Sequence, residues 1–505
     1  MHLFFRSIFI IFLTAQYFSL SAQSTKKADE LMLDYKYSEA IVELKPLAEK
    51  GNIQAIRKIA ECYRKTNDFV NAEKYYAIVV ADKNSNKKNW LYYGQILMNN
   101  NKYLDADKWL QGYLDTKPND SILVKTLLES CAKANQSLTP KRKIKFKNLD
   151  WINSNASDFC AVDFGNQIIF TSSREGKTNA YDGMSYSKVY VAEKKADTSW
   201  TIEPMKGIIN SKNFNSGPAS VHLASNKIYY TKNNVQYGDA IKNKKGDVTL
   251  KIFEAKLNNS ETKDFKELSF NDVEYSCAYP SINHDGDKIF FTSDRAGGFG
   301  GKDIYYSMYT NGVWSKPKNA GKNINTAGDE RYPFIHNDGT LYFSSTGHQG
   351  FGGMDIFKTI LSRSGEYLEA ENLGMPINSS ADDFGFFLDS NYTKGYISSN
   401  RPEGKGADDI YIFNYDDLLI HYTIYDGNIA LDSVRIKITN QQTNQEQIFY
   451  TNKKGIFETY LLPNQNYAIE VSKENYTSNT YSVKTSSVLI PIKKNINLEM
   501  IKKEN

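Results

Sequence analysis

The sequence predicts a multidomain protein of the α + all-β class, in which a helical array precedes a five-bladed β-propeller and a small C-terminal β-sandwich. Apolar residues follow helical spacing over residues 28–135, an asparagine turn recurs through the middle of the chain, and short alternating strands occupy the end. The five turns contain Asn153, Asn210, Asn271, Asn325 and Asn378, which are 57, 61, 54 and 53 residues apart. This period is somewhat longer than the roughly 40 to 45 residues of a standard four-stranded propeller blade.

The composition is that of a soluble globular protein. Of the 505 residues, 40% are hydrophobic and 24% are charged, and the 35 Tyr and 27 Phe residues suit a β-rich fold. The 62 basic and 58 acidic side chains nearly balance. Neither nucleic acid nor an anionic membrane surface is therefore indicated as a partner.

Residues 1–22 have the features of a secretory signal peptide. Arg6 precedes an apolar run at residues 8–13, and Ala22 stands at the expected cleavage site. An uncleaved anchor is the alternative, although the run is short for a bilayer span. Because no Cys follows the run to accept a lipid, we expect any membrane attachment to come through a partner.

Four cysteines, Cys62, Cys131, Cys160 and Cys277, show neither CxxC spacing nor a nearby His. Their predicted role is that of small buried hydrophobic residues. A disulfide between Cys62 and Cys131 is the alternative.

Residues 26–137 carry a second repeat, in which an aromatic residue precedes an alanine by three positions. The copies begin at Tyr37, Phe69 and Tyr103, which are 32 and 34 residues apart. Such an alanine lets two helices approach closely while the ring fills the groove between them. The segment resembles a tetratricopeptide repeat array, and the resemblance implies peptide or protein binding. A helical cap that only supports the propeller is the alternative.

Residues 143–416 repeat a strand that ends in a small polar run, followed by a second strand that often begins with Asp. Residues 291–295 and 303–305 are one such pair. These segments resemble the WD40-like repeats of TolB-type propellers. The fifth repeat lacks a last strand, whereas residues 143–146 form an orphan strand before the first turn. We predict that the orphan strand completes the fifth blade and closes the ring.

Glycine-rich connections join these strands, most fully at residues 296–302. No P-loop Lys-Ser/Thr pair follows, so a phosphate site is not expected. Asp355, in a repeat without an arginine at the matching position, is expected to accept backbone hydrogen bonds. The ion pairs predicted across the hairpin are Arg295 with Asp303 and Arg401 with Asp409. Calcium binding by these aspartates is the alternative.

Familiar catalytic constellations are missing from the sequence. The six histidines show no metal-binding spacing, and neither GxSxG nor HExxH occurs. Asp382 and Asp383 are neighbours, which on a strand point to opposite faces and do not form an acid/base pair. The sequence therefore predicts a protein that is not an enzyme and that has no catalytic residues, cofactor or metal. A hydrolase whose residues come from separate blades is the alternative.

Residues 419–500 contain short strands in which apolar and polar residues alternate, as at 434–438 and 467–471. This pattern predicts a small β-sandwich. The segment resembles the carboxypeptidase-regulatory-like domain, with Gly455 and Tyr467 at matching positions. Asn475 stands where that family commonly has Gly, and Asn tolerates a left-handed backbone.

The order of these segments resembles envelope proteins of the Bacteroidetes group, including an OmpA-family component associated with type IX secretion and gliding. Those relatives commonly continue into an OmpA-like domain, and its absence here puts peptidoglycan binding in doubt. The resemblance implies an exported, periplasmic, non-enzymatic scaffold at the outer membrane that mediates protein-protein interactions. Its expected partner is an outer-membrane β-barrel or lipoprotein. The alternatives are a glycan- or peptide-binding propeller and a cryptic propeller hydrolase.

Overall fold

The structure is a computed structural model that describes residues 25–134, 144–195, 199–362, 365–486 and 490–499. The chain divides into two compact units. Unit 1 contains residues up to 139, residues 148–386 and residues 397–410, and unit 2 contains residues 140–147, 387–396 and 411–505. The predicted signal peptide lies outside the described residues. No helix in the described part of the chain is long and apolar enough to cross a membrane.

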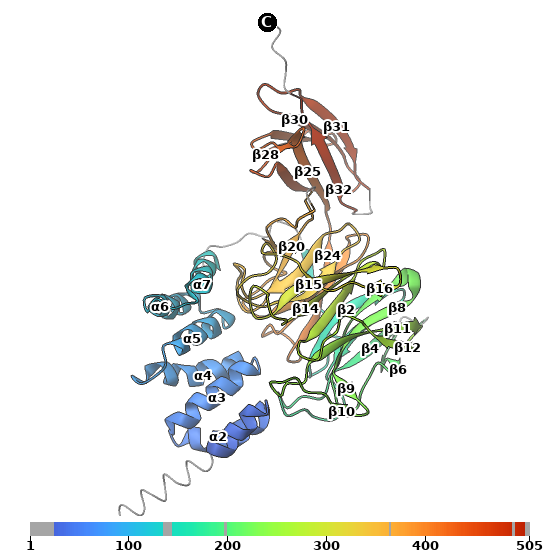
Figure 1. Ribbon diagram of the computed structural model, residues 1–505. Coiled ribbons are helices and arrows are strands. Elements are labelled where there is room, and N and C mark those ends of the chain that lie inside the picture. The colour runs from blue at the N-terminus through green and yellow to red at the C-terminus, as the bar shows by residue number, and fades with distance from the viewer. Residues whose placement is uncertain (1–24, 135–143, 196–198, 363–364, 487–489, 500–505) are drawn as a thin grey trace, which may run out of the picture. The chain divides into compact units, whose positions relative to one another are not determined.

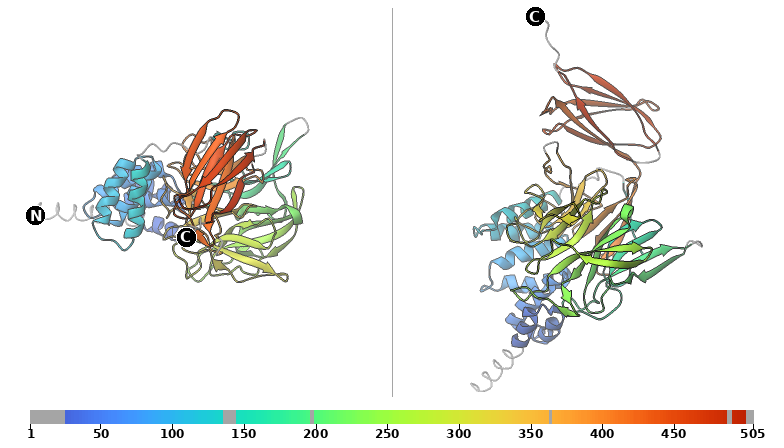
Figure 2. Two further views of the ribbon diagram at one scale, coloured as in Figure 1. Left: turned by 90° about the horizontal axis from the view of Figure 1, so that it is seen from above. Right: turned by 45° about the vertical axis from the view of Figure 1, so that its right-hand side comes forward.

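The helices of unit 1 follow one another without an intervening strand. After the helical residues 25–33 come α2 (Tyr37–Glu49), α3 (Ile53–Lys65), α4 (Phe69–Ala81), α5 (Lys88–Asn99), α6 (Tyr103–Leu114) and α7 (Ser121–Ala134). Consecutive helices pack against each other, and the blue helices stay together in both views of Figure 2. The repeat alanines Ala40, Ala72 and Ala106 are completely buried, as close helix packing requires.

The predicted fold class was wrong. The chain is mostly β, with 40% strand and 19% helix, and its helices do not make a tetratricopeptide solenoid. The aromatic-plus-alanine pattern specifies only that two neighbouring helices approach closely. It does not specify the superhelix that defines a solenoid.

Five sheets follow the helices, and each contains one of the predicted repeats (Figure 1). We call them blades 1 to 5. Blade 1 has the order β2 (Asp158–Phe164), β3 (Gln167–Ser172), β4 (Lys188–Lys194) and β5 (Trp200–Pro204). Blade 2 has the order β7 (Ser216–His222), β8 (Lys227–Asn233), β11 (Leu250–Asn258), β12 (Glu261–Glu267) and β6 (Lys206–Gly207). A separate small hairpin contains β9 (Val235–Gln236) and β10 (Asp239–Ala240).

The remaining blades repeat this plan. Blade 3 has β13 (Cys277–Ile282), β14 (Lys288–Ser293) and β15 (Asp303–Thr310), with β16 (Val313–Trp314) and β17 (Lys318–Asn319) both paired to β15. Blade 4 has β18 (Glu330–Ile335), β19 (Leu341–Ser345), β20 (Asp355–Thr359) and β21 (Glu371–Asn372). Blade 5 has β22 (Asp383–Leu388), β23 (Lys394–Ser399), β24 (Asp409–Tyr415) and β1 (Ile144–Asn148).

The orphan strand is part of blade 5, as its position in the sequence predicts. Strand β1 lies at the edge of that sheet beside β24. Phe146 stacks on Tyr411 with ring centroids 5.1 Å apart, and the Leu149 N–H donates to the Ile410 carbonyl at 3.0 Å. The segment before the first repeat therefore pairs with the last strand of the array and closes it.

The first strands of the blades form the inner ring of this propeller-like arrangement. Strand β7 contacts β2 and β13, and β13 contacts β18. Phe384 of β22 continues the ring, since it packs on Tyr332 of β18 at 4.8 Å and on Phe159 of β2 at 6.2 Å between ring centroids. The first strands of the blades therefore lie next to one another around the centre of the array.

The five predicted asparagine turns hold neighbouring blades together. The Ile304 N–H donates to Asn325 Oδ1 at 2.7 Å, and Asn325 Nδ2 donates back to the Ile304 carbonyl at 3.0 Å. The same paired bonds join Asn210 to Val189, Asn271 to Ile252, Asn378 to Ile356 and Asn153 to Ile410. We call these five residues the clamp asparagines. Each binds the third strand of the preceding blade, and Asn153 binds that of blade 5.

The C-terminal part of unit 2 has two sheets around one apolar core. In one, β25 (Leu418–Asp426) pairs with β26 (Ile429–Ala430), β29 (Ile456–Leu461) and β32 (Ile492–Asn497). The other has the order β28 (Glu446–Tyr450), β27 (Arg435–Asn440), β30 (Asn466–Ser472) and β31 (Asn479–Lys484).

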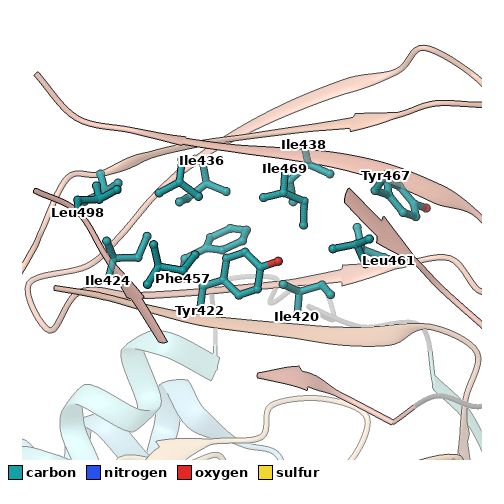
Figure 3. Close-up of a cluster of buried hydrophobic side chains, with 14 of the residues drawn as sticks. Ile420, Tyr422, Ile424, Ile436, Ile438, Phe457, Leu461, Tyr467, Ile469 and Leu498 are labelled. Atoms are coloured by element: carbon teal, nitrogen blue, oxygen red, sulfur yellow. The ribbon is translucent and has the colours of Figure 1, made fainter. Parts of the chain in front are cut away.

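The alternation predicted for β27 and β30 is confirmed, because every second residue of both strands is buried. Figure 3 shows Tyr422 and Phe457 of one sheet pointing toward Ile436 and Ile469 of the other. Removing these side chains from water stabilises the module. Asn475 has the left-handed φ of 65° expected of it.

Candidate functional site

The arginine partners predicted from the sequence are wrong. Arg401 binds Asp383, at the start of the first strand of its own blade, at 2.8 Å, and not Asp409. Arg174 binds Asp158 in the same way at 2.6 Å. Arg295 donates to Cys277 Sγ at 3.2 Å, and Cys277 also begins a first strand. The spacing shows that two residues share a hairpin, but it does not show which strand the guanidinium points toward.

The aspartates that begin the third strands bind the glycine-rich loops instead. Asp303 Oδ2 accepts the N–H of Phe299 at 2.7 Å, and Asp355 Oδ2 accepts that of Phe351 at 2.8 Å. Asp409 Oδ1 likewise accepts the Gly406 N–H at 2.9 Å. The backbone role predicted for Asp355 is confirmed and applies to its equivalents. These carboxylates fix the glycine-rich loops.

Asp382 and Asp383 are both buried but have different partners, and only Asp383 belongs to strand β22, so the predicted alternation does not apply to the pair. Asp383 is completely buried and pairs with Arg401.

Asp382 accepts the Met354 N–H at 2.8 Å from blade 4. It belongs to a position that every blade repeats, immediately before the first strand. We call the five residues at this position the junction residues. They are Ser157, Asn215, Ser276, Asp329 and Asp382.

The junction residues perform one structural task. In blade 2, Asn215 Oδ1 accepts the Ser187 N–H of blade 1 at 2.9 Å, and the Asn215 N–H donates to Asn233 Oδ1 at 2.8 Å. In blade 3, the hydroxyl of Ser276 accepts the Leu250 N–H of blade 2 at 3.2 Å. An uncharged side chain is therefore sufficient to join two blades at this position.

The junction residues of blades 4 and 5 are charged, whereas those of blades 1 to 3 are uncharged. We call the two charged junction residues, together with three charged neighbours, the charged sector. It consists of Lys302, Asp329, Arg331, Asp382 and Asp408. Arg331 and Asp329 form an ion pair, and Lys302 is joined to Asp329 by a β-bridge. Asp408 forms a corresponding bridge to Ser157 and accepts a hydrogen bond from its hydroxyl.

The surroundings of the charged sector shift its pKa values. Burial raises the pKa of Asp382, and it raises the pKa of Asp408 to about 6, with the nearby Asp382 carboxylate acting in the same direction. The Arg331 guanidinium, together with burial, lowers the pKa of Lys302 to about 8. The residue Asp408 is nevertheless partly exposed. The charged sector therefore contains charged groups that are largely buried, although solvent still reaches some of them.

An aromatic belt lies beside the charged sector on the first strands. It consists of Tyr279, Tyr332, Phe384 and Phe159, whose successive ring centroids are 4.1, 4.8 and 6.2 Å apart. All except Phe384 are partly exposed. Tyr279 and Tyr332 have left-handed φ angles of 56° and 51°, which for non-glycine residues costs on the order of 1–3 kcal/mol each.

The helices contact the loops at this end of the blades. The Tyr181 hydroxyl donates to the Lys65 carbonyl of α3 at 2.9 Å, and the Gly350 N–H donates to Ser130 Oγ of α7 at 3.1 Å. A Cβ added at Gly353 would lie 1.9 Å from Asp382 Oδ1 and 2.9 Å from Asn99 Nδ2. A residue of α5 and a carboxylate of the charged sector thus both lie close to the point that a Cβ of residue 353 would occupy.

The four cysteines are buried and free, as predicted for small hydrophobic residues. Cys62 and Cys131 belong to different apolar clusters of the helices. Within the described ranges, no group of three or more His, Cys, Asp or Glu side chains is arranged to hold a metal ion.

No known protein family matches the sequence, and no curated protein matches it. Solved structures match parts of the chain at low identity and low TM-score. An endo-arabinase from Bacteroides thetaiotaomicron matches at 14% identity over 54% of this chain and 97% of its own, with a TM-score of 0.34. A putative glycosidase from the same organism matches at 8% over 54% and 97%, with a TM-score of 0.35. Hydrazine synthase from Kuenenia stuttgartiensis matches at 10% over 68% of this chain and 63% of its own, with a TM-score of 0.33.

These similarities correct the expectation that the protein is not an enzyme. Several similar structures are named as glycosidases or glycoside hydrolases, so the missing sequence motifs do not justify that exclusion. The motifs that the sequence lacks belong to other folds, and a propeller brings its functional residues together from separate blades. No residue role is transferred at these identities.

Proposed function

We propose that the protein binds a carbohydrate at the charged sector and the aromatic belt. One observation carries the proposal: equivalent junctions are made by Asn215 and Ser276, so the fold does not require charge at Asp329 and Asp382. Burying a charged group costs free energy unless it is paired and hydrogen-bonded, and uncharged junction residues avoid that cost. Carboxylate and guanidinium groups next to partly exposed aromatic side chains suit a ligand with many hydroxyl groups and apolar ring faces.

Titration calorimetry with a panel of neutral and acidic oligosaccharides tests this proposal. Tyr332→Ala removes the centre of the belt and Asp382→Asn removes one carboxylate, and both are expected to weaken binding at least tenfold. Glu203→Gln, at an exposed position of blade 1, is the matched control and should bind as the unchanged protein does. The proposal fails if no oligosaccharide binds, or if both site variants bind normally.

Hydrolysis of the bound glycan is the second candidate function, and the pair of carboxyl groups favours it. Asp408, with a pKa of about 6, holds a proton at mildly acidic pH, as a general acid must, and the Asp382 carboxylate lies near enough to raise that pKa. Asp408→Asn should abolish release of reducing ends and leave binding intact. Turnover that survives this substitution would remove Asp408 from the mechanism.

The cellular setting remains a separate proposal. The N-terminal pattern supports export, and the resemblance to Bacteroidetes envelope proteins supports a place at the outer membrane beside a β-barrel or lipoprotein. Fractionation of envelopes followed by purification of the tagged protein tests both points. Recovery from the cytosol alone would contradict them.

A further inference from the structure

We infer that the ligand is an acidic saccharide whose carboxylate lies between Lys302 and Arg331. The inference rests on the proposed carbohydrate binding and names its chemical class. Lys302 and Arg331 come from adjacent blades, and both lie next to Asp329: Lys302 through the β-bridge and Arg331 through its ion pair. The backbone also joins them, because the Glu330 N–H donates to the Lys302 carbonyl at 2.6 Å.

Lys302 is a cation for which the described part of the chain provides no hydrogen-bond partner. Among the described residues its ammonium group makes no hydrogen bond and no ion pair, although Asp329 and Asp294 lie near enough to act on it electrostatically. The residue is only partly exposed. A partly buried ammonium group that lacks both full hydration and a partner is a favourable place for an anion.

Arg331 also has unused hydrogen-bonding capacity. One terminal nitrogen donates to Asp329, whereas Nε is buried and has no partner. Asp329 therefore holds the guanidinium in place while part of its donor capacity stays unpaired. An arginine held in this way favours a planar, two-oxygen acceptor such as a carboxylate.

The neighbouring belt indicates that the carboxylate belongs to a sugar. Arg331 is followed directly by Tyr332, whose ring stacks on Tyr279 at 4.1 Å. A uronic acid presents an apolar ring face to such an aromatic side chain and a carboxylate at its edge. Both features of the ligand then match groups that are adjacent on the same strand.

The local charges explain why an anion would be held. The groups that act on Lys302 are Arg331 and Asp329 of blade 4, Asp294 of blade 3 and Lys65 of α3. Arg331 is the largest influence, and it lowers the pKa of Lys302 to about 8 together with burial. An anion placed between the two cations relieves their repulsion and favours the protonated Lys302.

Trigalacturonate and its fully methyl-esterified form give a matched pair of probes that share one saccharide backbone and differ in whether the carboxyl groups are free and charged. Calorimetry should show at least tenfold tighter binding of the acid at pH 7, because only the acid can form charge-assisted hydrogen bonds with the two cations. Lys302→Gln should remove most of this difference and leave the affinity for the ester unchanged. Lys322→Gln, an exposed lysine of the same region, is the control.

The pH dependence gives a second readout. Affinity for trigalacturonate should fall as the pH rises from 7 to 9, because Lys302 loses its proton in that interval, and the ester should show no such fall. Equal binding of acid and ester, or an unchanged preference in Lys302→Gln, overturns this inference while carbohydrate binding stands. Failure of every saccharide to bind overturns the proposed function as well.

Discussion

The junctions of blades 2 and 3 and those of blades 4 and 5 solve one structural problem with different chemistry. Asn215 and Ser276 join their blades with uncharged groups. Asp382 makes the same kind of bond to Met354 with a carboxylate whose pKa is raised by burial, and Asp329 occupies the equivalent position beside two cations. The fold needs a hydrogen-bond acceptor here, and only one side of the ring supplies it in charged form.

This difference between the junctions defines two classes of residue. The first class maintains the fold, and the second is tolerated by the fold but not needed for it. Clamp asparagines are present in every repeat and bond to backbone in every repeat, so they belong to the first class. The charged sector breaks the repeat and adds a desolvation cost, so it belongs to the second. Substitutions in the two classes should therefore have opposite consequences for stability and for binding.

The largest expected effect is the loss of the clamp that closes the ring. Asn153→Ala leaves the N–H and carbonyl of Ile410 without their partners, at a cost of about 2–5 kcal/mol in the free energy of unfolding. Urea denaturation followed by tryptophan fluorescence measures this loss. Asn155→Ala, at the exposed position two residues later, is the control and should change little.

The second prediction concerns a buried carboxyl in the charged half of the ring. Glu330 is completely buried, and desolvation raises its pKa from 4.5 to about 7. Because the folded pKa exceeds the unfolded one, stability should fall as the pH rises from about 4.5 to 7 and then level off, by at most about 3 kcal/mol. Glu330→Gln should flatten most of this slope in denaturation curves recorded between pH 5 and 8. An unchanged slope would mean that Glu330 is ionised throughout.

The third prediction concerns substitutions that exchange an uncharged and a charged junction residue. Asn215→Asp places a carboxylate where an amide makes the junction, and should destabilise the protein by about 1–2 kcal/mol at pH 7. Asp382→Asn makes the reverse change, and should leave stability equal or higher because it removes a buried charge. Thermal denaturation of both variants compares them directly. A large loss of stability in Asp382→Asn would show that the carboxylate serves the fold.

The smallest expected effect is at the contact between the helices and blade 1. Tyr181→Phe removes the hydroxyl that donates to the Lys65 carbonyl at 2.9 Å, and the part-exposed position limits the cost to about 1 kcal/mol. Hydrogen exchange at the end of α3 should increase in this variant. Exchange that is unchanged there would mean that water replaces the hydroxyl without loss.

The sequence predicts the elements of the β-structure well because its signals are local and repeated. The asparagine turns, the orphan strand of blade 5 and the alternation in β27 and β30 all follow from spacing. Spacing does not predict the proportion of helix to strand or the partners of Arg295 and Arg401, because these depend on which segments meet in space. The charged sector was missed for the same reason: Asp382 appeared only as a neighbour of Asp383, and its meaning emerges when equivalent positions of all five blades are compared.

The central claim is that the charged sector serves a ligand and not the fold. The most direct measurement is calorimetric titration of trigalacturonate into the unchanged protein and into Asp382→Asn, with the unfolding free energy of both proteins determined in the same buffer. Our account predicts that the substitution weakens binding at least tenfold and leaves the unfolding free energy within about 1 kcal/mol of its original value. Binding of unchanged affinity, or a loss of stability as large as that of Asn153→Ala, would contradict it.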